Sequence, residues 1–115
     1  DYGTVSYQTL ILKRTEFVNK VLQLGYNVLL CDIDAVWLRN PLQYLTRVYD
    51  IEAQPEADGR LCGGFMYLRS TKAAQFVWAK VTEKHRRIVK EAIQRKSLRN
   101  IDESEQVVLL DLLKM

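Results

Sequence analysis

The apolar residues near the start of the chain follow the spacing of an α-helix. Between Tyr7 and Leu24 they recur at intervals that place them on one side of a helix. They are Leu10, Phe17, Val18, Val21 and Leu22. Gly25 follows, at the position where a glycine with positive φ commonly ends a helix. The pattern predicts an amphipathic helix from Tyr7 to Leu24 with these apolar side chains on its inner face.

An uninterrupted apolar run comes next, from Val28 to Cys31. Such a run is typical of a strand covered on both faces, as in the middle of a parallel sheet. Asp32 and Asp34 stand at its carboxyl end, and the alternation of side chains along a strand would point both carboxylates to the same side. The sequence RNP then predicts a turn into a short helical stretch that begins at Pro41.

Two further strands are predicted, from Val48 to Ala53 and from Leu61 to Leu68. The sequence QPEADGR between them, with its proline and its Asp58–Gly59 pair, favours a loop or hairpin turn.

The remainder has the pattern of two helices. Ser70 or Thr71 is placed to cap a long helix, whose inner face repeats apolar residues at helical spacing. These are Ala74, Val77, Trp78, Val81, Ile88, Val89 and Ala92. The last segment opens with Asp102 and has Glu105 three residues later, a capping-box pattern, before the apolar run VVLLDLL.

The order helix, strand, strand, strand, helix, helix predicts an α/β fold. At 115 residues, with 48% hydrophobic and 27% charged residues, the chain has the composition of one ordinary globular domain. Three strands make a thin sheet for a nucleotide-binding domain, so we interpret residues 1–115 as the central part of a larger catalytic domain. No apolar run approaches the roughly 20 residues that span a bilayer, and any membrane attachment would need a segment outside this sequence.

The net charge of +3 says little about partners, although basic residues gather between Glu83 and Arg99. That run could bind a nucleic acid or another anionic partner. Glu83 and Glu91 interrupt it and no aromatic residue interleaves with it, which favours a solvated helix face without nucleic acid. The two cysteines, Cys31 and Cys62, are too few for a cysteine-rich zinc site, and their apolar neighbours favour buried thiols, with a single disulfide left open.

The acidic pair carries the most chemical information. Two carboxylates a few Å apart repel each other unless a cation or a proton lies between them. Mg and Mn prefer oxygen ligands, and Mg often takes only one or two carboxylates together with substrate phosphates. The pair DID by itself is equally consistent with two carboxylates that simply face water at a strand end.

The neighbouring residues resemble a known family. The segments GYNVLLCDIDAVWLRNPLQYL and CGGFMYLRSTKAAQFVWAKV resemble the nucleotide-diphospho-sugar transferases, glycosyltransferases of the GT-A fold, in which a G-x-x-V-L-x-x-D-x-D-x-x-W-x-x-x-P pattern carries a metal-binding D-x-D. EQVVLLDLL is similar to a third family segment, although the family more often has Asp-Gln at its start. The resemblance implies a GT-A-like, Rossmann-like three-layer sandwich, and a place in the Golgi or another lumen of the secretory pathway.

The resemblance also implies roles for individual residues. Asp32 would contact the donor ribose or the metal, and Asp34 would bind Mn or Mg directly. Lys13 or Arg14 could add a cation to the donor phosphates. Gly63 and Gly64 would let the backbone approach a sugar closely, and Glu105 and Gln106 would lie near its reacting face.

Two further residues are given structural roles. His85 lies on the Val81 to Ile88 face of the long helix, far after the aspartates in the chain, and is interpreted as a boundary residue with a satisfied ring. The resemblance would then place the family's histidine ligand of the metal beyond Met115. Trp37 is interpreted as a core residue.

The predicted function is metal-dependent transfer of a sugar from a nucleotide-diphosphate donor to an acceptor hydroxyl on a glycan or glycoprotein. One alternative is a phosphatase of the haloacid-dehalogenase class, in which Asp32 would be the nucleophile, Asp34 the general acid and Ser70 part of a second motif. Another alternative is a non-enzymatic module that binds an anionic partner through its basic helix.

Overall fold

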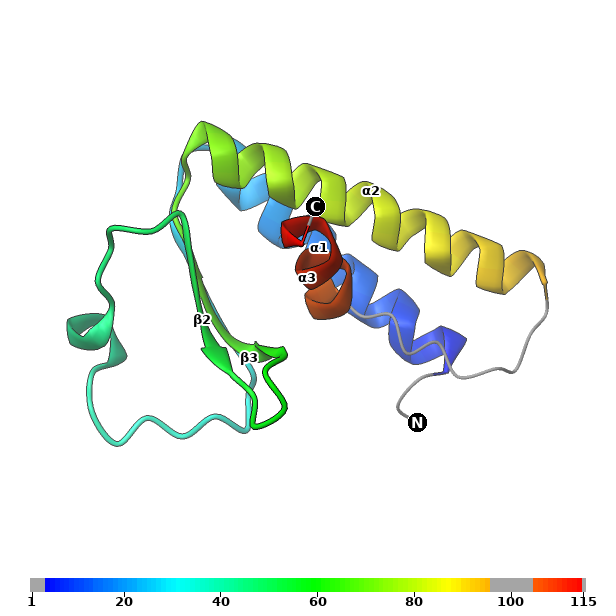
Figure 1. Ribbon diagram of the computed structural model, residues 1–115. Coiled ribbons are helices and arrows are strands. Elements are labelled where there is room, and N and C mark those ends of the chain that lie inside the picture. Colours follow the sequence, from blue (N-terminus) through cyan, green and yellow to red (C-terminus); the bar gives the residue numbers. More distant parts are fainter. Residues whose placement is uncertain (1–3, 96–104, 115) are drawn as a thin grey trace.

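The computed structural model describes residues 4–95 and 105–114. Three helices and a three-stranded sheet make up this part of the chain (Figure 1). In chain order the elements are α1 (Val5–Gln23), β1 (Val28–Cys31), the 3-10 helix η1 (Pro41–Tyr44), β2 (Ile51–Pro55), β3 (Leu61–Leu68), α2 (Lys72–Gln94) and α3 (Glu105–Leu113). The predicted α/β class is confirmed.

The sheet is antiparallel, with the strand order β1-β3-β2. Val28 pairs with Leu68 and Cys31 with Phe65, so β3 runs back along β1. The parallel arrangement expected for β1 is therefore wrong, as is its central position, since β1 is an edge strand of the described sheet. An apolar run shows only that a strand is covered, and here β3 rather than β1 has partners on both sides.

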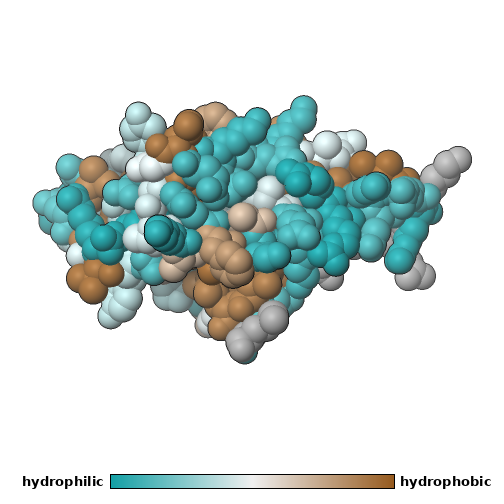
Figure 2. Space-filling model, turned by 90° about the horizontal axis from the view of Figure 1, so that it is seen from above, coloured by the Kyte–Doolittle hydropathy of each residue, from teal (hydrophilic) through white to brown (hydrophobic). Residues whose placement is uncertain are grey.

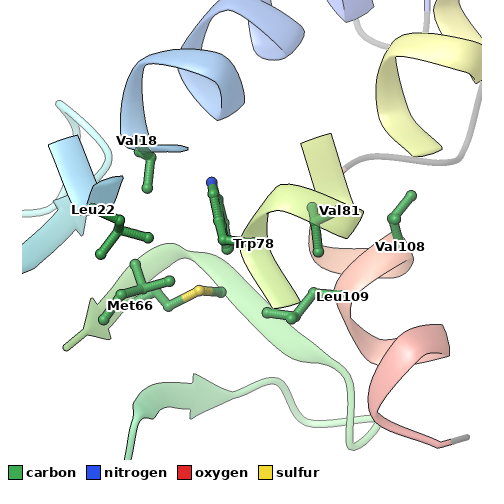
Figure 3. Packing of buried hydrophobic residues seen from close by; sticks show 8 residues of the cluster. Val18, Leu22, Met66, Trp78, Val81, Val108 and Leu109 are labelled. Carbon is green, nitrogen blue, oxygen red and sulfur yellow. The ribbon is translucent and has the colours of Figure 1, made fainter. Parts of the chain in front are cut away.

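The hydrophobic core lies between the sheet and the three helices (Figure 3). Alternate residues of each strand face it, as the two-residue period of a strand requires. The buried cluster consists of Val18 and Leu22 from α1, Met66 and Leu68 from β3, Trp78 and Val81 from α2, and Val108 and Leu109 from α3. All three helices therefore pack on one face of the sheet, and the other face is left to the loops.

The helix α1 buries only part of the predicted inner face, with Val18 and Leu22 in the core as expected. Gly25 has a φ of +92° and ends the helix as expected. However, Leu10 and Phe17 are 64% and 68% exposed, whereas Thr15 is buried. The Thr15 hydroxyl is satisfied because it donates to the carbonyl of Ile11 at 3.1 Å. Apolar residues occur almost all round this helix, so packing against α2 decided which of them turned inward.

The helix α2 begins as predicted, with Thr71 as its N-cap, because the Thr71 hydroxyl accepts a hydrogen bond from the amide of Ala74. Trp78 is fully buried, and its indole N–H donates to the carbonyl of Thr15 across the α1–α2 interface. His85 is also fully buried in the same interface, so its interpretation as a boundary residue is wrong.

The remaining predictions are confirmed to different extents. β3 covers Leu61–Leu68 as predicted, whereas β2 covers Ile51–Pro55 rather than 48–53. Gly59, with a φ of +83°, lies in the predicted turn between them. Asp102, the first residue of the predicted capping box, lies outside the described residues, as does the side chain of Glu105.

We expect residues 1–115 expressed alone to self-associate. Many large apolar side chains in the described residues face solvent, among them Leu10 and Phe17 on α1, and β1 has an unpaired edge. Gel filtration should show oligomers, and a Leu10→Gln, Phe17→Gln variant should raise the monomer fraction without loss of helical circular dichroism. A monomer with a sharp thermal transition would contradict this expectation.

Candidate functional site

Asp32 and Asp34 follow β1 and border one open cavity of about 610 Å³. The amide of Asp32 donates to the carbonyl of Gly64, so the pairing of β1 with β3 extends one residue beyond the strand. The amide of Ala35 then donates back to the Asp32 carbonyl, and the chain turns there. Both aspartates therefore border the same cavity, although a turn after the strand, and not the alternation of side chains along it, places Asp34 there.

Arg14 of α1 forms an ion pair with Asp32. Its Nη1 atom lies 2.8 Å from Oδ1 of Asp32, and both side chains are partly exposed. Lys13, its neighbour, is exposed. Of the two cations proposed from the sequence, Arg14 is thus the one that reaches the acidic pair.

Gly64 leaves the space that the Asp32 carboxylate occupies. A Cβ atom added to Gly64 would lie 2.8 Å from Oδ2 of Asp32, closer than real Cβ contacts. The carboxylate of Asp32 is therefore held between the Arg14 guanidinium and the bare backbone of β3. Glycine at position 64 therefore makes room for the Asp32 carboxylate, in addition to the close approach of a sugar expected from the sequence.

Gln106 forms a hydrogen bond with the backbone of the other glycine, Gly63. Its Oε1 atom accepts a hydrogen bond of 2.7 Å from the amide of Gly63, which ties α3 to β3. Gly64 lines the cavity, whereas Gly63 and Gln106 are not among its lining residues. The side chain of Glu105 lies outside the described residues.

Trp37 lines the cavity and is 51% exposed, so its interpretation as a core residue is wrong. Its indole N–H donates to the sulfur of Cys31 at 3.1 Å. The segment after Asp34 leaves the sheet on the side away from the helices (Figure 1). Cys31 and Cys62 are free, partly exposed thiols, which corrects their prediction as buried side chains.

Glu52 of β2 holds the loop that carries η1. Its carboxylate accepts hydrogen bonds of 2.8 to 2.9 Å from the amides of Thr46 and Arg47 and from the Thr46 hydroxyl. Partial desolvation raises the pKa of Glu52, but these hydrogen bonds outweigh it and the pKa is lowered. Arg47 has a φ of 57°, which a residue other than glycine rarely adopts, so the contacts of Glu52 stabilise a strained turn.

His85 lies away from the cavity, between α1 and α2. Its Nδ1 atom is 3.2 Å from the Thr15 hydroxyl, and its Nε2 atom has no hydrogen-bond partner among the described residues. Burial lowers the pKa of His85, the nearby charge of Arg14 lowers it further, and Glu16 acts in the opposite direction. The ring is therefore neutral at pH 7 and is a packing residue of the helix pair.

The carboxylates of Asp32 and Asp34 suit a hard divalent cation. Within residues 4–95 and 105–114, no three His, Cys, Asp or Glu side chains gather as a ready-made metal site. Two carboxylates on one open cavity still fit Mg or Mn, which commonly complete their coordination with water and substrate phosphates. The donor atoms present therefore match a cation that arrives with a phosphate ligand.

Comparison with known proteins decides the family. The sequence model of the nucleotide-diphospho-sugar transferases matches residues 1–101. This chain belongs to that family.

Relatives with assigned activities are glycosyltransferases. The chain is 28% identical over 102 residues to a UDP-D-xylose:L-fucose alpha-1,3-D-xylosyltransferase of Arabidopsis thaliana, an alignment that covers 71% of this chain and 28% of the relative. It is 35% identical over 80 residues to the beta-arabinofuranosyltransferase RAY1 of the same plant (60% and 15% of the two chains). It is 29% identical over 82 residues to a UDP-galactose:fucoside alpha-3-galactosyltransferase of Dictyostelium discoideum (62% and 13%).

The family members are longer than this chain, which spans about a quarter of the xylosyltransferase. No solved structure matches significantly. In the part of the chain that the structure describes, no helix is both long and apolar enough to cross a bilayer.

The antiparallel sheet argues against Ser70 as the second motif of the phosphatase alternative. Ser70 follows Leu68, which pairs with Val28 at the start of β1, whereas Asp32 lies beyond the other end of that strand. The Ser70 hydroxyl donates to the carbonyl of Leu22 at 2.6 Å. Ser70 therefore ties β3 to α1 and is not placed beside Asp32 as the second phosphatase motif requires.

The basic helix is a solvated surface. Lys80 pairs with Glu83, Lys84 with Asp111, and Arg86 with Glu16, so acidic neighbours offset several of its cations. The view over α2 in Figure 2 shows a mainly hydrophilic face with scattered hydrophobic patches. This arrangement supports the solvated-face interpretation over the anionic-partner alternative.

Replacing Glu52 should loosen one wall of the cavity. Because its lowered pKa stabilises the folded loop, that contribution is present above the ordinary Glu pKa of about 4.3 and is lost as the pH falls through the lower folded value. The protection factors of the Thr46 and Arg47 amides, which correct for the pH dependence of intrinsic exchange, should therefore fall in Glu52→Ala at pH 7 and, in the wild type, on acidification. Unchanged protection of both amides in Glu52→Ala would contradict this role.

Proposed function

We propose that this chain forms the donor-binding part of a metal-dependent glycosyltransferase, which moves a sugar from a nucleotide-diphosphate donor to an acceptor hydroxyl. The observation that carries the proposal is the placement of Asp32 and Asp34 on one cavity, with Arg14 paired to Asp32. The family membership of residues 1–101 supports it.

The two aspartates have different surroundings and so suit different tasks. Asp32 is held by Arg14 and by the packing of Gly64, which fixes the direction of its carboxylate. Asp34 is exposed on the cavity wall and is open to a cation from solvent. When bound, Mn or Mg would neutralise charge on the nucleoside diphosphate that leaves the sugar.

Arg14 supplies a fixed positive charge beside the acidic pair. A guanidinium presents several N–H donors in one plane, so it can contact a carboxylate and still donate to a phosphate or hydroxyl oxygen. Lys13 is exposed, and we assign the cationic role to Arg14, which pairs with Asp32. Gln106 holds the amide of Gly63 and so supports the backbone beside Gly64, the glycine that the sugar would approach in the cavity. We keep Glu105 as a candidate for the reacting face of the sugar.

The names of the relatives suggest substrates. Two of them are named for the transfer of xylose or galactose from a UDP-sugar to L-fucose or a fucoside. We propose a UDP-sugar donor and a sugar hydroxyl of a glycan or glycoprotein as acceptor for this protein as well. Such acceptors are built in the secretory pathway, and we place the enzyme in the Golgi or a related lumen.

Binding of a donor nucleotide should depend on the cation. Titration calorimetry of the full-length protein should show UDP binding with Mn, and at least tenfold weaker binding with a chelator or in Asp34→Asn, since a ligand oxygen of the metal is lost. Asp58→Asn, which changes an exposed carboxylate in the β2–β3 turn, is the matched control and should bind like the wild type. Equal UDP affinity with Mn and with the chelator would contradict the proposed role of Asp32 and Asp34 in metal binding.

Arg14 and Lys13 give a test between adjacent cations. Arg14→Ala should weaken UDP binding about tenfold, because it removes a charged hydrogen-bond donor next to the diphosphate and leaves Asp32 unpaired. Lys13→Ala should change the affinity less than twofold. Circular dichroism checks that α1 is intact in both variants. A larger loss in Lys13→Ala than in Arg14→Ala would contradict the assignment.

A further inference from the structure

The cavity beside the acidic pair has two kinds of wall. Asp32, Asp34 and Gly64 form its acidic part. The rest is largely apolar and aromatic, with Val36, Trp37, Leu38, Pro41, Tyr44 and Phe65. The cation at Asp32 comes from α1, whereas all but one of these apolar side chains come from the segment that follows Asp34. Asp34 and most of the aromatic wall thus lie on one segment, whereas the cation at Asp32 comes from α1.

The aromatic wall is held in position although it faces solvent. The indole N–H of Trp37 is bound to the Cys31 sulfur at the end of β1, which orients the ring. Asn40 caps η1 by accepting from the Leu42 amide, and Glu52 fixes the turn that follows it. A large ring kept half in water leaves apolar area that a ligand could bury with a gain in free energy.

We propose that Trp37, with Tyr44, is the platform on which the acceptor sugar stacks. The C–H face of a pyranose is apolar and flat enough to cover an indole, while its hydroxyls stay in water or meet the polar residues of the cavity. This inference rests on the proposed transferase function, because it assigns the second substrate to the same cavity.

The exposure of Trp37 favours the acceptor over the nucleobase of the donor. An acceptor sugar remains attached to a larger glycan, so the group that holds it must be reachable from solvent. Trp37 also stands three residues after Asp34, which would place the acceptor hydroxyl beside the end of the donor that reacts. Positioning of this kind is how a binding residue raises the rate of a two-substrate reaction.

The test compares Trp37→Leu with Trp37→Phe in the full-length protein, with Phe76→Leu as control because Phe76 is an exposed aromatic residue outside the cavity. Three quantities are measured: the affinity for UDP, the rate at which the UDP-sugar donor is hydrolysed by water, and the rate of sugar transfer to methyl α-L-fucopyranoside. Trp37→Leu should raise the KM for the fucoside about tenfold and leave UDP affinity and donor hydrolysis unchanged, because only the stacking face is lost. Trp37→Phe should restore most of the loss, and Phe76→Leu should resemble the wild type.

Two results would overturn the proposal. An equal loss of UDP affinity in Trp37→Leu would assign the ring to the nucleobase, and an unchanged KM for the fucoside would leave it a structural residue. If the wild type binds no UDP and transfers no sugar, the proposed function fails, and saturation-transfer NMR with the fucoside alone decides the platform separately. Saturation of the sugar C–H protons in the wild type and its loss in Trp37→Leu would support a sugar site, and equal signals in both would exclude it.

Discussion

The antiparallel pairing of β1 with β3 is the constraint on which the site depends. It continues past the strand through the hydrogen bond from the Asp32 amide to the Gly64 carbonyl. The same pairing sets the bare backbone of Gly64 against the Asp32 carboxylate. A side chain at residue 64 would force that carboxylate to shift from the position in which it pairs with Arg14. The strand register therefore fixes the position of the first carboxylate before any ligand binds.

The buried polar contacts between α1 and α2 set the rotation of α1. Thr15 meets His85 through its hydroxyl and Trp78 through its carbonyl, so this side of α1 must face α2. Successive residues of a helix are turned by about 100°, which brings Arg14 toward the end of β1 and leaves Lys13 in solvent. The polar groups between α1 and α2 thus decide that Arg14, and not Lys13, pairs with Asp32.

The loop between β1 and β2 forms the remaining wall of the cavity with little hydrophobic cover of its own. Local hydrogen bonds hold it instead: Trp37 to Cys31, Asn40 to Leu42, and Glu52 to Thr46 and Arg47. Such contacts keep aromatic side chains in place at the surface, where a substrate can reach them. The helices packed on one face of the sheet thus stabilise the fold. The hydrogen-bonded loop on the other face carries the side chains proposed to bind substrate.

The sequence by itself determined the α/β class, the position of β3, the Thr71 cap, the glycine turns and the acidic pair after an apolar strand, because each depends on residues that are neighbours in the chain. It also carried the family resemblance, through the D-x-D segment. Only the tertiary structure decided that the sheet is antiparallel, that Arg14 rather than Lys13 reaches Asp32, that His85 is buried and that Trp37 lines the cavity. These features depend on contacts between segments far apart in sequence, and local patterns leave them open: α1 offers more than one apolar face, and an apolar run does not state the direction of its neighbours.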